Sequence, residues 1–296
     1  IILRKYKGSN IRTNTEVKLI IKDRYKILGI ECYDQIKKEK FYIKINKKLI
    51  ISCGVIESAK LLMRSKIKNK NIGKKFSCHL SGAVDALFLD DKKEIEGNFS
   101  AIEVTTDDKL CQKFANQNVP KEIILSRMPF LNFKNPFDKI SKISSWVFNV
   151  SSTDTGYLHS NYFDYHLNFN LTKSEFDNVK KFIYKISEFL FDLGAVNVFP
   201  NILNNENFTR NLEEVEKLLK NIQISELLLT ASHLFGTCCI AKNDDSGVIN
   251  ENFQVFNHDN LFVVDSSIFP FPTSYNPQLT IMIFAKIASN IITNDE

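Results

Sequence analysis

Residues 49–65 read LIISCGVIESAKLLMRS, and this stretch decides the fold. Its first three residues form a continuous apolar run, as expected of a strand that is buried on both faces of a parallel sheet. Gly54 then gives the backbone the freedom for a tight turn into a helix. The apolar residues of that helix recur at helical spacing and are Ile56, Ala59, Leu62 and Met63. The succession of strand, glycine and helix predicts an α/β fold.

Alternating and continuous apolar runs predict further strands on both sides of this stretch. In the first of them, Val17, Leu19 and Ile21 alternate and are expected on one face. Near the other end of the chain, residues 261–264 form a second buried strand. The strands predicted before residue 49 cover residues 15–21, 27–33 and 41–45.

The chain ends in a predicted helix from about Pro277 to Ile292. Asn276 suits the N-cap, and Pro277 suits the first helical position because its missing N–H needs no partner there. The apolar residues that we assign to its buried stripe are Leu279, Met282, Ala285 and Ile287.

The middle of the chain, residues 81–230, has more aromatic residues and alternating segments, and we interpret it as a separate region of sheet and helix. Thr172 and Glu175 form a capping box, which predicts a helix that stops at Gly194. A shorter helix is predicted over residues 212–219. Because this region mixes both element types, the chain as a whole is α/β with an α+β character.

Composition describes an ordinary soluble protein. The 296 residues carry 39 basic and 34 acidic side chains, a formal charge of +5, and 44% are hydrophobic. The length suggests about two domains and excludes disordered, collagen-like and disulfide-stapled classes. Lysine is scattered among Ile, Asn and Phe rather than clustered, so no nucleic-acid partner is expected.

The six cysteines form no CxxC pair, which favours a reducing, cytoplasmic location. No apolar run reaches the roughly 18–20 residues of a membrane helix, so no membrane span is expected. The chain opens with Ile1 in what reads as the middle of a domain. We therefore expect an N-terminal part of the protein to be missing from this sequence.

Polar and small residues follow both predicted buried strands, at residues 52–58 and 264–280. The carboxyl ends of strands are where α/β sheets bind ligands. Asp265 at a strand end, followed by a loop and a helix N-terminus, is suited to binding a polar cofactor and to stabilising negative charge on it.

Several segments resemble the glucose-methanol-choline family of FAD-dependent oxidoreductases in residue type, order and spacing. Its C-terminal signature is matched by SHLFGTC at 232–238, SGV at 246–248, NLFVVD at 260–265 and NPQLT at 276–280. The mid-chain segments of the family are similar to CGVIES at 53–58 and to NIGK at 71–74 with His79. Residues 85–224 match only in outline.

The resemblance implies FAD as cofactor and a small-molecule alcohol, sugar or polyol as substrate, with the electron acceptor left unspecified. It implies a partial, Rossmann-like FAD-binding domain that is discontinuous in the sequence. This domain would comprise residues 1–80 and 231–296, and a substrate-binding domain would comprise residues 81–230.

The same resemblance implies a role for each site residue. His233 matches the active-site histidine and Asn276 the second active-site position. The pair makes chemical sense, because an imidazole titrates near neutral pH and can take a hydroxyl proton while an amide holds the hydroxyl.

The remaining residues would contact FAD. The ribityl or pyrophosphate part would lie against Asp265 and Ser266, and the adenosine end near Val17, Cys53 and Gly54. The N-terminus of the last helix would face the pyrimidine side of the flavin, through Pro277, Gln278 and Thr280.

Each assignment has a structural alternative. His233 can be an ordinary core histidine, Asn276 and Asp265 only caps, and Gly54 only a turn residue. A zinc site built from His233 with Cys238 and Cys239 is the least favoured reading, because adjacent cysteines suit tetrahedral coordination poorly.

Two features depart from the family pattern. None of the ten glycines forms the GxGxxG fingerprint that binds the FAD pyrophosphate, and Cys239 stands where arginine is usual. The alternative function is therefore a non-catalytic fragment or binding subunit with an incomplete flavin site.

Overall fold

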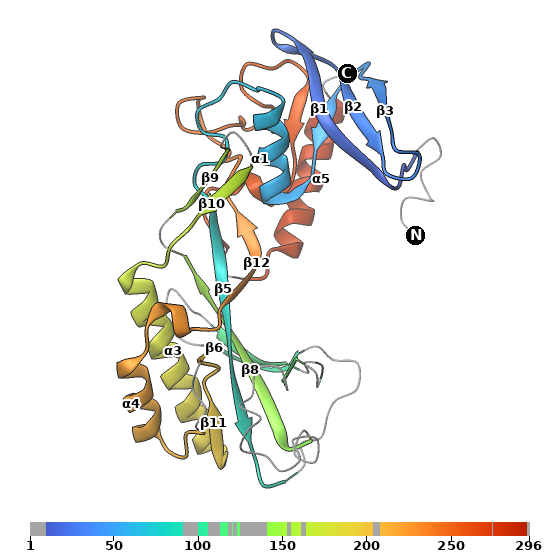
Figure 1. Cartoon of the computed structure of the whole chain (residues 1–296). Helices are drawn as coiled ribbons and strands as arrows, with labels where there is room; N and C mark the ends of the chain where they lie inside the picture. The colour runs from blue at the N-terminus through green and yellow to red at the C-terminus, as the bar shows by residue number, and fades with distance from the viewer. Residues whose placement is uncertain are drawn as a thin grey trace.

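The computed structural model describes residues 10–90, 100–105, 113–117, 120, 123–124, 141–152, 155–160, 164–203, 208–273 and 275–294. The described chain forms two lobes that are joined by the long strand β5 (Ser77–Leu87), with β12 (Thr230–Phe235) beside it (Figure 1). Its mixture of helix and strand confirms the α/β class. No helix among the described residues is long and apolar enough to cross a membrane.

The upper lobe in Figure 1 combines an antiparallel sheet, a parallel strand pair and two helices around one core. The antiparallel sheet has the order β1-β2-β3, and the parallel pair is β4 with β13. The hairpin of β9 and β10 joins the same core through Leu158 and Tyr165. The elements are β1 (Thr15–Asp23), β2 (Lys26–Asp34), β3 (Glu39–Lys44), β4 (Leu49–Ile51), α1 (Gly54–Arg64), β9 (Tyr157–Ser160), β10 (Tyr165–Asn168), β13 (Leu261–Val263), η5 (Ser266–Ile268) and α5 (Gln278–Asn294).

The lower lobe is a six-stranded sheet, as far as the described residues go, with two helices packed beside it. Its order is β11-β5-β8-β7-β6, and β12 pairs with the first half of β5. The core lies between the sheet and α3, around Trp146, Phe148 and Phe182. The further elements are β6 (Ser100–Thr105), β7 (Lys113–Gln117), β8 (Ile143–Ser151), α3 (Lys173–Asp192), β11 (Asn197–Phe199), α4 (Leu212–Asn221) and η4 (Ile224–Glu226).

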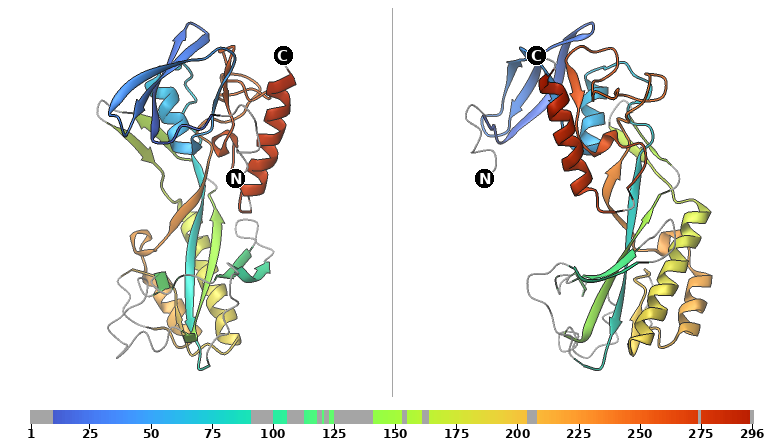
Figure 2. Two further views of the ribbon diagram at one scale, coloured as in Figure 1. Left: turned by 90° about the vertical axis from the view of Figure 1, so that its right-hand side faces the viewer. Right: turned by 180° about the vertical axis from the view of Figure 1, so that it is seen from behind.

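The structure contains the helices that the strongest local signals of the sequence predict. β4 is followed by Gly54, whose φ of 82° is in the left-handed region, and α1 begins there. In α3, Thr172 and Glu175 form the predicted capping box, and Gly194 (φ 88°) follows the helix end. The last helix begins near the junction of the lobes and runs away from it (Figure 2).

Burial differs from the sequence prediction in two strands. In β1 the core residue is Ile20 (4% exposed), whereas Leu19 and Ile21 are each 38% exposed. The cause is a register shift between Val17 and Leu19 in the pairing with β2, which breaks the simple alternation. In β4, Ile50 is 49% exposed although its register partner Phe262 on β13 is buried (3% exposed), so the exposure is confined to β4.

The predicted buried stripe of α5 is also wrong. Leu279, Met282 and Ile287 are exposed, and the residues that pack on the core are Ile281, Phe284, Ala288 and Ile292. Apolar residues lie around most of this helix, so spacing alone does not select the face that is buried.

Candidate functional site

The two polar stretches predicted at strand ends lie side by side. β4 and β13 are parallel and in register, with Phe262 opposite Ile50, so their carboxyl ends meet at one edge. The Val264 N–H donates to the Ile51 carbonyl (2.9 Å), and the Ser52 hydroxyl donates to the Val264 carbonyl (2.7 Å). The loops that carry the predicted FAD contacts therefore start from a single strand end.

Asp265 is held by donors of the chain itself. Its Oδ2 accepts from the Gly54 N–H (3.0 Å) and the Ser58 hydroxyl (2.5 Å), and its Oδ1 accepts from the Ser267 N–H (2.8 Å). A carboxylate in this place caps η5 and stabilises the N-terminus of α1. Asp265 thus fixes the turn at Gly54, and a contact to a cofactor stays a prediction. Ser266, the first residue of η5, is partly exposed beside it.

The turn at Gly54 has an open side. A Cβ added to Gly54 would meet no heavy atom within 4 Å, so only the backbone conformation requires glycine here. The neighbouring Cys53 is exposed. Partial burial raises the pKa of the Cys53 thiol, which therefore stays protonated at neutral pH. The turn offers a sterically open surface to a ligand.

Arg64, at the far end of α1 from this turn, binds the backbone of Val17, and sequence reasoning missed it. Its guanidinium donates to the Val17 carbonyl (2.7 Å) from the last turn of α1. The positive charge of Arg64 also lowers the pKa of the Cys53 thiol, but less than burial raises it. Arg64 Nε is buried without a hydrogen-bond partner in the described structure. Of the three predicted adenosine contacts, Val17 is bound by Arg64 and Cys53 is within its electrostatic range.

His233 lies on β12, directly across from His79 on β5. The two ring centroids are 5.6 Å apart and the rings are perpendicular (89°). His79 is 1% exposed, and its Nε2 contacts the carbonyl oxygen of Thr273; His233 is partly exposed. Both Nδ1 atoms are buried, and neither has a hydrogen-bond partner within the described ranges. The sequence motif located His233, but the pairing with His79 comes from the sheet register.

Burial keeps both imidazoles neutral. It lowers the pKa of His79 to about 4, with a smaller effect from the nearby His233, and it also lowers the pKa of His233. A neutral imidazole has a free lone pair and can accept a proton. His233 is partly accessible and in the basic form at neutral pH.

The first turn of α5 lies at the junction of the lobes, near β12 (Figures 1 and 2). Asn276 and Gln278 are exposed, Thr280 is partly buried, and Pro277 is buried. The Pro277 carbonyl accepts from the Ile281 N–H (2.8 Å), which starts the helix. Asn276 makes no side-chain hydrogen bond with any described residue, so the predicted N-cap is not formed. The contact of His79 with Thr273 ties this segment to the His233 strand.

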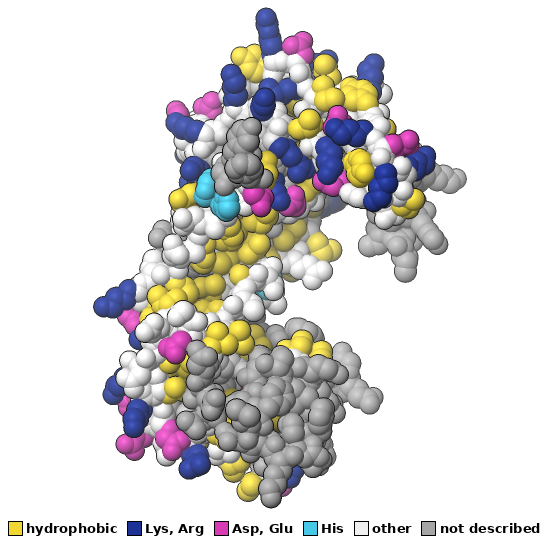
Figure 3. Space-filling model, in the orientation of Figure 1, with side chains coloured by type: hydrophobic (Ala, Val, Ile, Leu, Met, Phe, Trp, Pro, Cys, Tyr) yellow, Lys and Arg dark blue, Asp and Glu magenta, His cyan; other side chains and the backbone are white. Residues whose placement is uncertain are grey.

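After His233, the chain continues from β12 into the strand-end loops. The Thr237 hydroxyl donates to the Val55 carbonyl in α1, and the Cys238 N–H donates to the Ser267 carbonyl (2.9 Å). A hollow separates the two lobes, with hydrophobic side chains over its surface (Figure 3). The histidine strand, the Gly54 turn and the start of α5 thus form one continuous framework.

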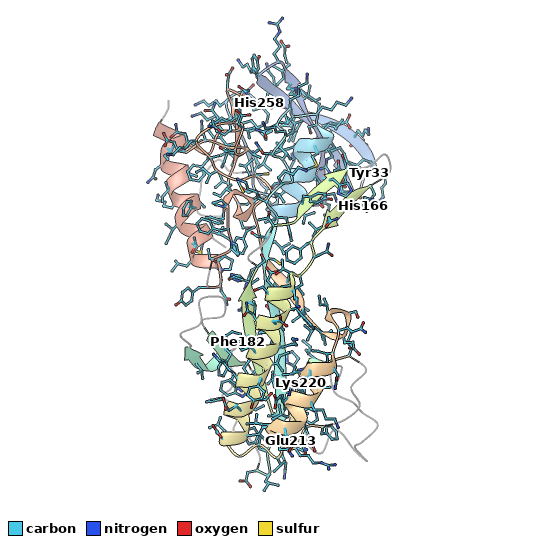
Figure 4. The ribbon with its side chains drawn as sticks, turned by 90° about the vertical axis from the view of Figure 1, so that its left-hand side faces the viewer. Tyr33, His166, Phe182, Glu213, Lys220 and His258 are labelled. Atoms are coloured by element: carbon cyan, nitrogen blue, oxygen red, sulfur yellow. The ribbon has the colours of Figure 1, made fainter. Side chains whose placement is uncertain are left out.

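The zinc alternative involves His233, Cys238 and Cys239. Both cysteines are buried, and burial raises the pKa of both thiols, that of Cys239 to about 11. No group of three or more His, Cys, Asp or Glu able to hold a metal occurs in the part of the chain that the structure describes. His166 and His258 lie elsewhere in the upper lobe (Figure 4).

Comparison with known families gives two matches, both described as GMC oxidoreductase. The N-terminal profile matches residues 3–81, and the C-terminal profile matches residues 152–285. Together they cover most of the chain and include the Gly54 turn, His79 and His233.

Similar proteins span much more than this chain. The long-chain-alcohol oxidase FAO4A of Arabidopsis thaliana is 22% identical over 277 residues, which are 83% of this chain and 37% of that protein. The cholesterol oxidase of Acinetobacter baumannii is 38% identical over 72 residues, 23% of this chain and 13% of that protein. The chain therefore spans less than two fifths of the length of these curated relatives.

Solved structures share the fold. The pyridoxine 4-oxidase from Mesorbium loti superposes with a TM-score of 0.69 at 16% identity, covering 93% of this chain and 56% of that one. A formate oxidase superposes with a TM-score of 0.66 at 14% identity, covering 95% and 60%. Nearly the whole chain thus corresponds to slightly more than half of each of these structures.

Proposed function

Because this chain belongs to the GMC oxidoreductase family, we propose that it is part of an FAD-dependent oxidoreductase that acts on the CH–OH group of an alcohol, sugar or polyol. FAD is the cofactor that the family supports. The substrate class is favoured by the names of the relatives, which include a long-chain-alcohol oxidase and a cholesterol oxidase. The electron acceptor is left unassigned.

The observation that carries the proposal is the state of His233. This histidine is partly exposed at the junction of the lobes, its pKa is lowered by burial, and its Nδ1 is buried. A general base must be accessible and unprotonated at the working pH. We assign the substrate proton to Nε2 because Nδ1 is enclosed by protein.

Asn276 is the proposed partner of the substrate hydroxyl. Its exposed amide has no other described role, since it does not cap α5. An amide can donate to the hydroxyl oxygen while His233 removes the proton. Bound FAD supplies the hydride acceptor. The first turn of α5, with Pro277, Gln278 and Thr280, presents the positive end of the helix dipole.

The residues around Gly54 fit part of the dinucleotide. The turn is sterically open at Gly54, and the neighbouring Cys53 is exposed, so a ligand can approach the backbone here. Asp265 acts by fixing the Gly54 turn, with the partly exposed Ser266 as the adjacent contact.

The pyrophosphate fingerprint is not among the glycines of this chain, so we propose that further polypeptide completes the FAD site. The surface that it would cover is apolar. Ile50 on β4 and a row of residues on α5 are exposed, although parallel strands are normally covered on both faces. The two solved structures also contain further chain, because this protein covers 56% of one and 60% of the other.

The test compares His233→Ala with His159→Ala, a change at an exposed histidine of β9, in the FAD-loaded protein. We expect His233→Ala to keep bound flavin and to slow flavin reduction by an alcohol or sugar by about 10²-fold or more. His159→Ala should leave the rate unchanged. Reduction at the wild-type rate in His233→Ala would refute the assignment of the base.

The second candidate is a non-catalytic binding subunit, and the missing fingerprint together with the exposed apolar face favours it. It predicts a folded chain that binds no flavin even with a large excess of FAD and with its partner present. A bound flavin spectrum that is bleached by an alcohol would reject this alternative.

A further inference from the structure

His79 joins the two parts of the proposed site. It belongs to β5, and the register of β5 with β12 places it opposite His233, with the rings edge to face. Phe235, two residues further along β12, packs on the same ring at 5.5 Å between centroids. His79 is therefore held on its sides by the strand that carries the proposed base.

The polar edge of His79 points to a different segment. Its Nε2 contacts the backbone carbonyl of Thr273, which lies between η5 and α5 and precedes Asn276 by three residues. A carbonyl oxygen can only accept, so the hydrogen of the neutral ring is on Nε2. The segment is also braced internally, because the Thr273 hydroxyl donates to the Tyr275 carbonyl (2.6 Å).

Packing alone does not explain a histidine at this position. Its Nδ1 is buried and has no hydrogen-bond partner among the described residues, which lowers stability relative to an apolar ring of similar size. What the histidine adds is one N–H, directed at the segment that carries Asn276.

We propose that His79 is a positioning residue that fixes the spacing between His233 and Asn276, by its edge-to-face contact with the first and its Nε2–H donation to the Thr273 carbonyl. The functional part rests on the proposed roles of His233 and Asn276. The structural part, the tether to Thr273, stands independently and can be measured in the chain without FAD.

Two variants separate the ring from its donor. His79→Phe keeps an aromatic ring against His233 and removes the N–H, whereas His79→Gln keeps an N–H near the position of Nε2. Hydrogen exchange is followed in the peptide that contains Thr273 and Asn276, with the β13 peptide as reference. We expect exchange about 10-fold faster in His79→Phe and near the wild-type rate in His79→Gln, with β13 unchanged.

Equal exchange in wild type and His79→Phe would overturn the tether. It would equally be overturned if both variants loosened the Thr273 and β13 peptides together, because this is the pattern of general destabilisation.

The second measurement is a double-mutant cycle on flavin reduction in the FAD-loaded protein. We expect Asn276→Ala to slow reduction by about 10-fold in the wild-type background and by less than about 2-fold in His79→Phe, because the amide is already misplaced there. Equal effects in both backgrounds would overturn the positioning role. If neither Asn276→Ala nor His233→Ala slows reduction, the proposed function fails, while the exchange result still decides the tether.

Discussion

The helices α3 and α5 are both rich in apolar residues, but they use them differently. In α3, Val179, Phe182, Ile186 and Leu190 are fully buried against the sheet of the lower lobe. In α5, Leu279 is 69% exposed and Met282 is 61% exposed, although the opposite face packs on Phe253 and Phe269. Among the described residues, the lower lobe buries the apolar face of α3, whereas α5 has a second apolar face that is left uncovered.

The strands show the same contrast. β5 and β8 lie inside a six-stranded sheet, and α3 covers it. β4 and β13 form a parallel pair without a further strand among the described residues, and Ile50 in its middle is 49% exposed. Parallel sheets are stable when both faces are covered. Among the described residues, the upper lobe therefore leaves apolar surface uncovered on β4 and on α5.

The largest expected effect is a difference in stability between a substitution in α3 and one in α5. Phe182→Ala should lower the free energy of unfolding by about 3–5 kcal/mol, because Phe182 is fully buried (Figure 4). Met282→Ala should change it by less than about 0.5 kcal/mol in the isolated chain. Urea unfolding measures both, by circular dichroism and by the fluorescence of Trp146, the single tryptophan.

The contrast between the two helices would be wrong if Met282→Ala lowered the free energy of unfolding of the isolated chain by more than about 2 kcal/mol. Such a loss would mean that the exposed face of α5 is covered in solution, for example by a second copy of the chain. Sedimentation of wild type and Met282→Ala at several concentrations would then identify self-association.

The next effect concerns the junction between the lobes and depends on pH. Burial depresses the pKa of His79 from 6.5 to about 4, so the unfolded chain binds this proton more readily than the folded one. The stability that comes from the neutral ring is complete above pH 6.5 and is lost as pH falls toward 4. One pKa unit corresponds to about 1.4 kcal/mol, so the loss is of the order of 3 kcal/mol.

Urea midpoints at pH 7 and pH 5 for wild type and His79→Gln isolate this contribution. The pKa values of His233 and His258 are also lowered by burial and act in the same direction, but they are common to both proteins. We expect a smaller pH dependence in His79→Gln. An identical pH dependence in the two proteins would contradict a neutral, buried His79.

Local signals in the sequence are sufficient for the elements that they define. Gly54 after an apolar run gave the strand and helix boundary, and the Thr172 capping box gave the start of α3, because both act within a few residues. The buried face of α5 was predicted wrongly, because apolar residues lie all round the helix and the packing partners are distant in sequence.

The site follows the same rule. The family motif located His233 and Asn276, and their chemical roles stay predictions. The pairing of His233 with His79 depends on the register of two strands about 150 residues apart. The contact of Arg64 with the Val17 carbonyl depends on how α1 packs on β1. Neither arrangement leaves a periodic pattern in the sequence.

The smallest expected effect compares how the two helices begin. The Thr172 hydroxyl accepts from the Glu175 N–H (3.2 Å), so Thr172→Ala should cost about 1 kcal/mol of stability. Asn276→Ala should cost no more than a few tenths of a kcal/mol, because its side chain caps no described N–H. Thermal unfolding of the two variants tests this difference. A cost at Asn276 equal to that at Thr172 would return Asn276 to a capping role and remove the reason to reserve its amide for a substrate hydroxyl.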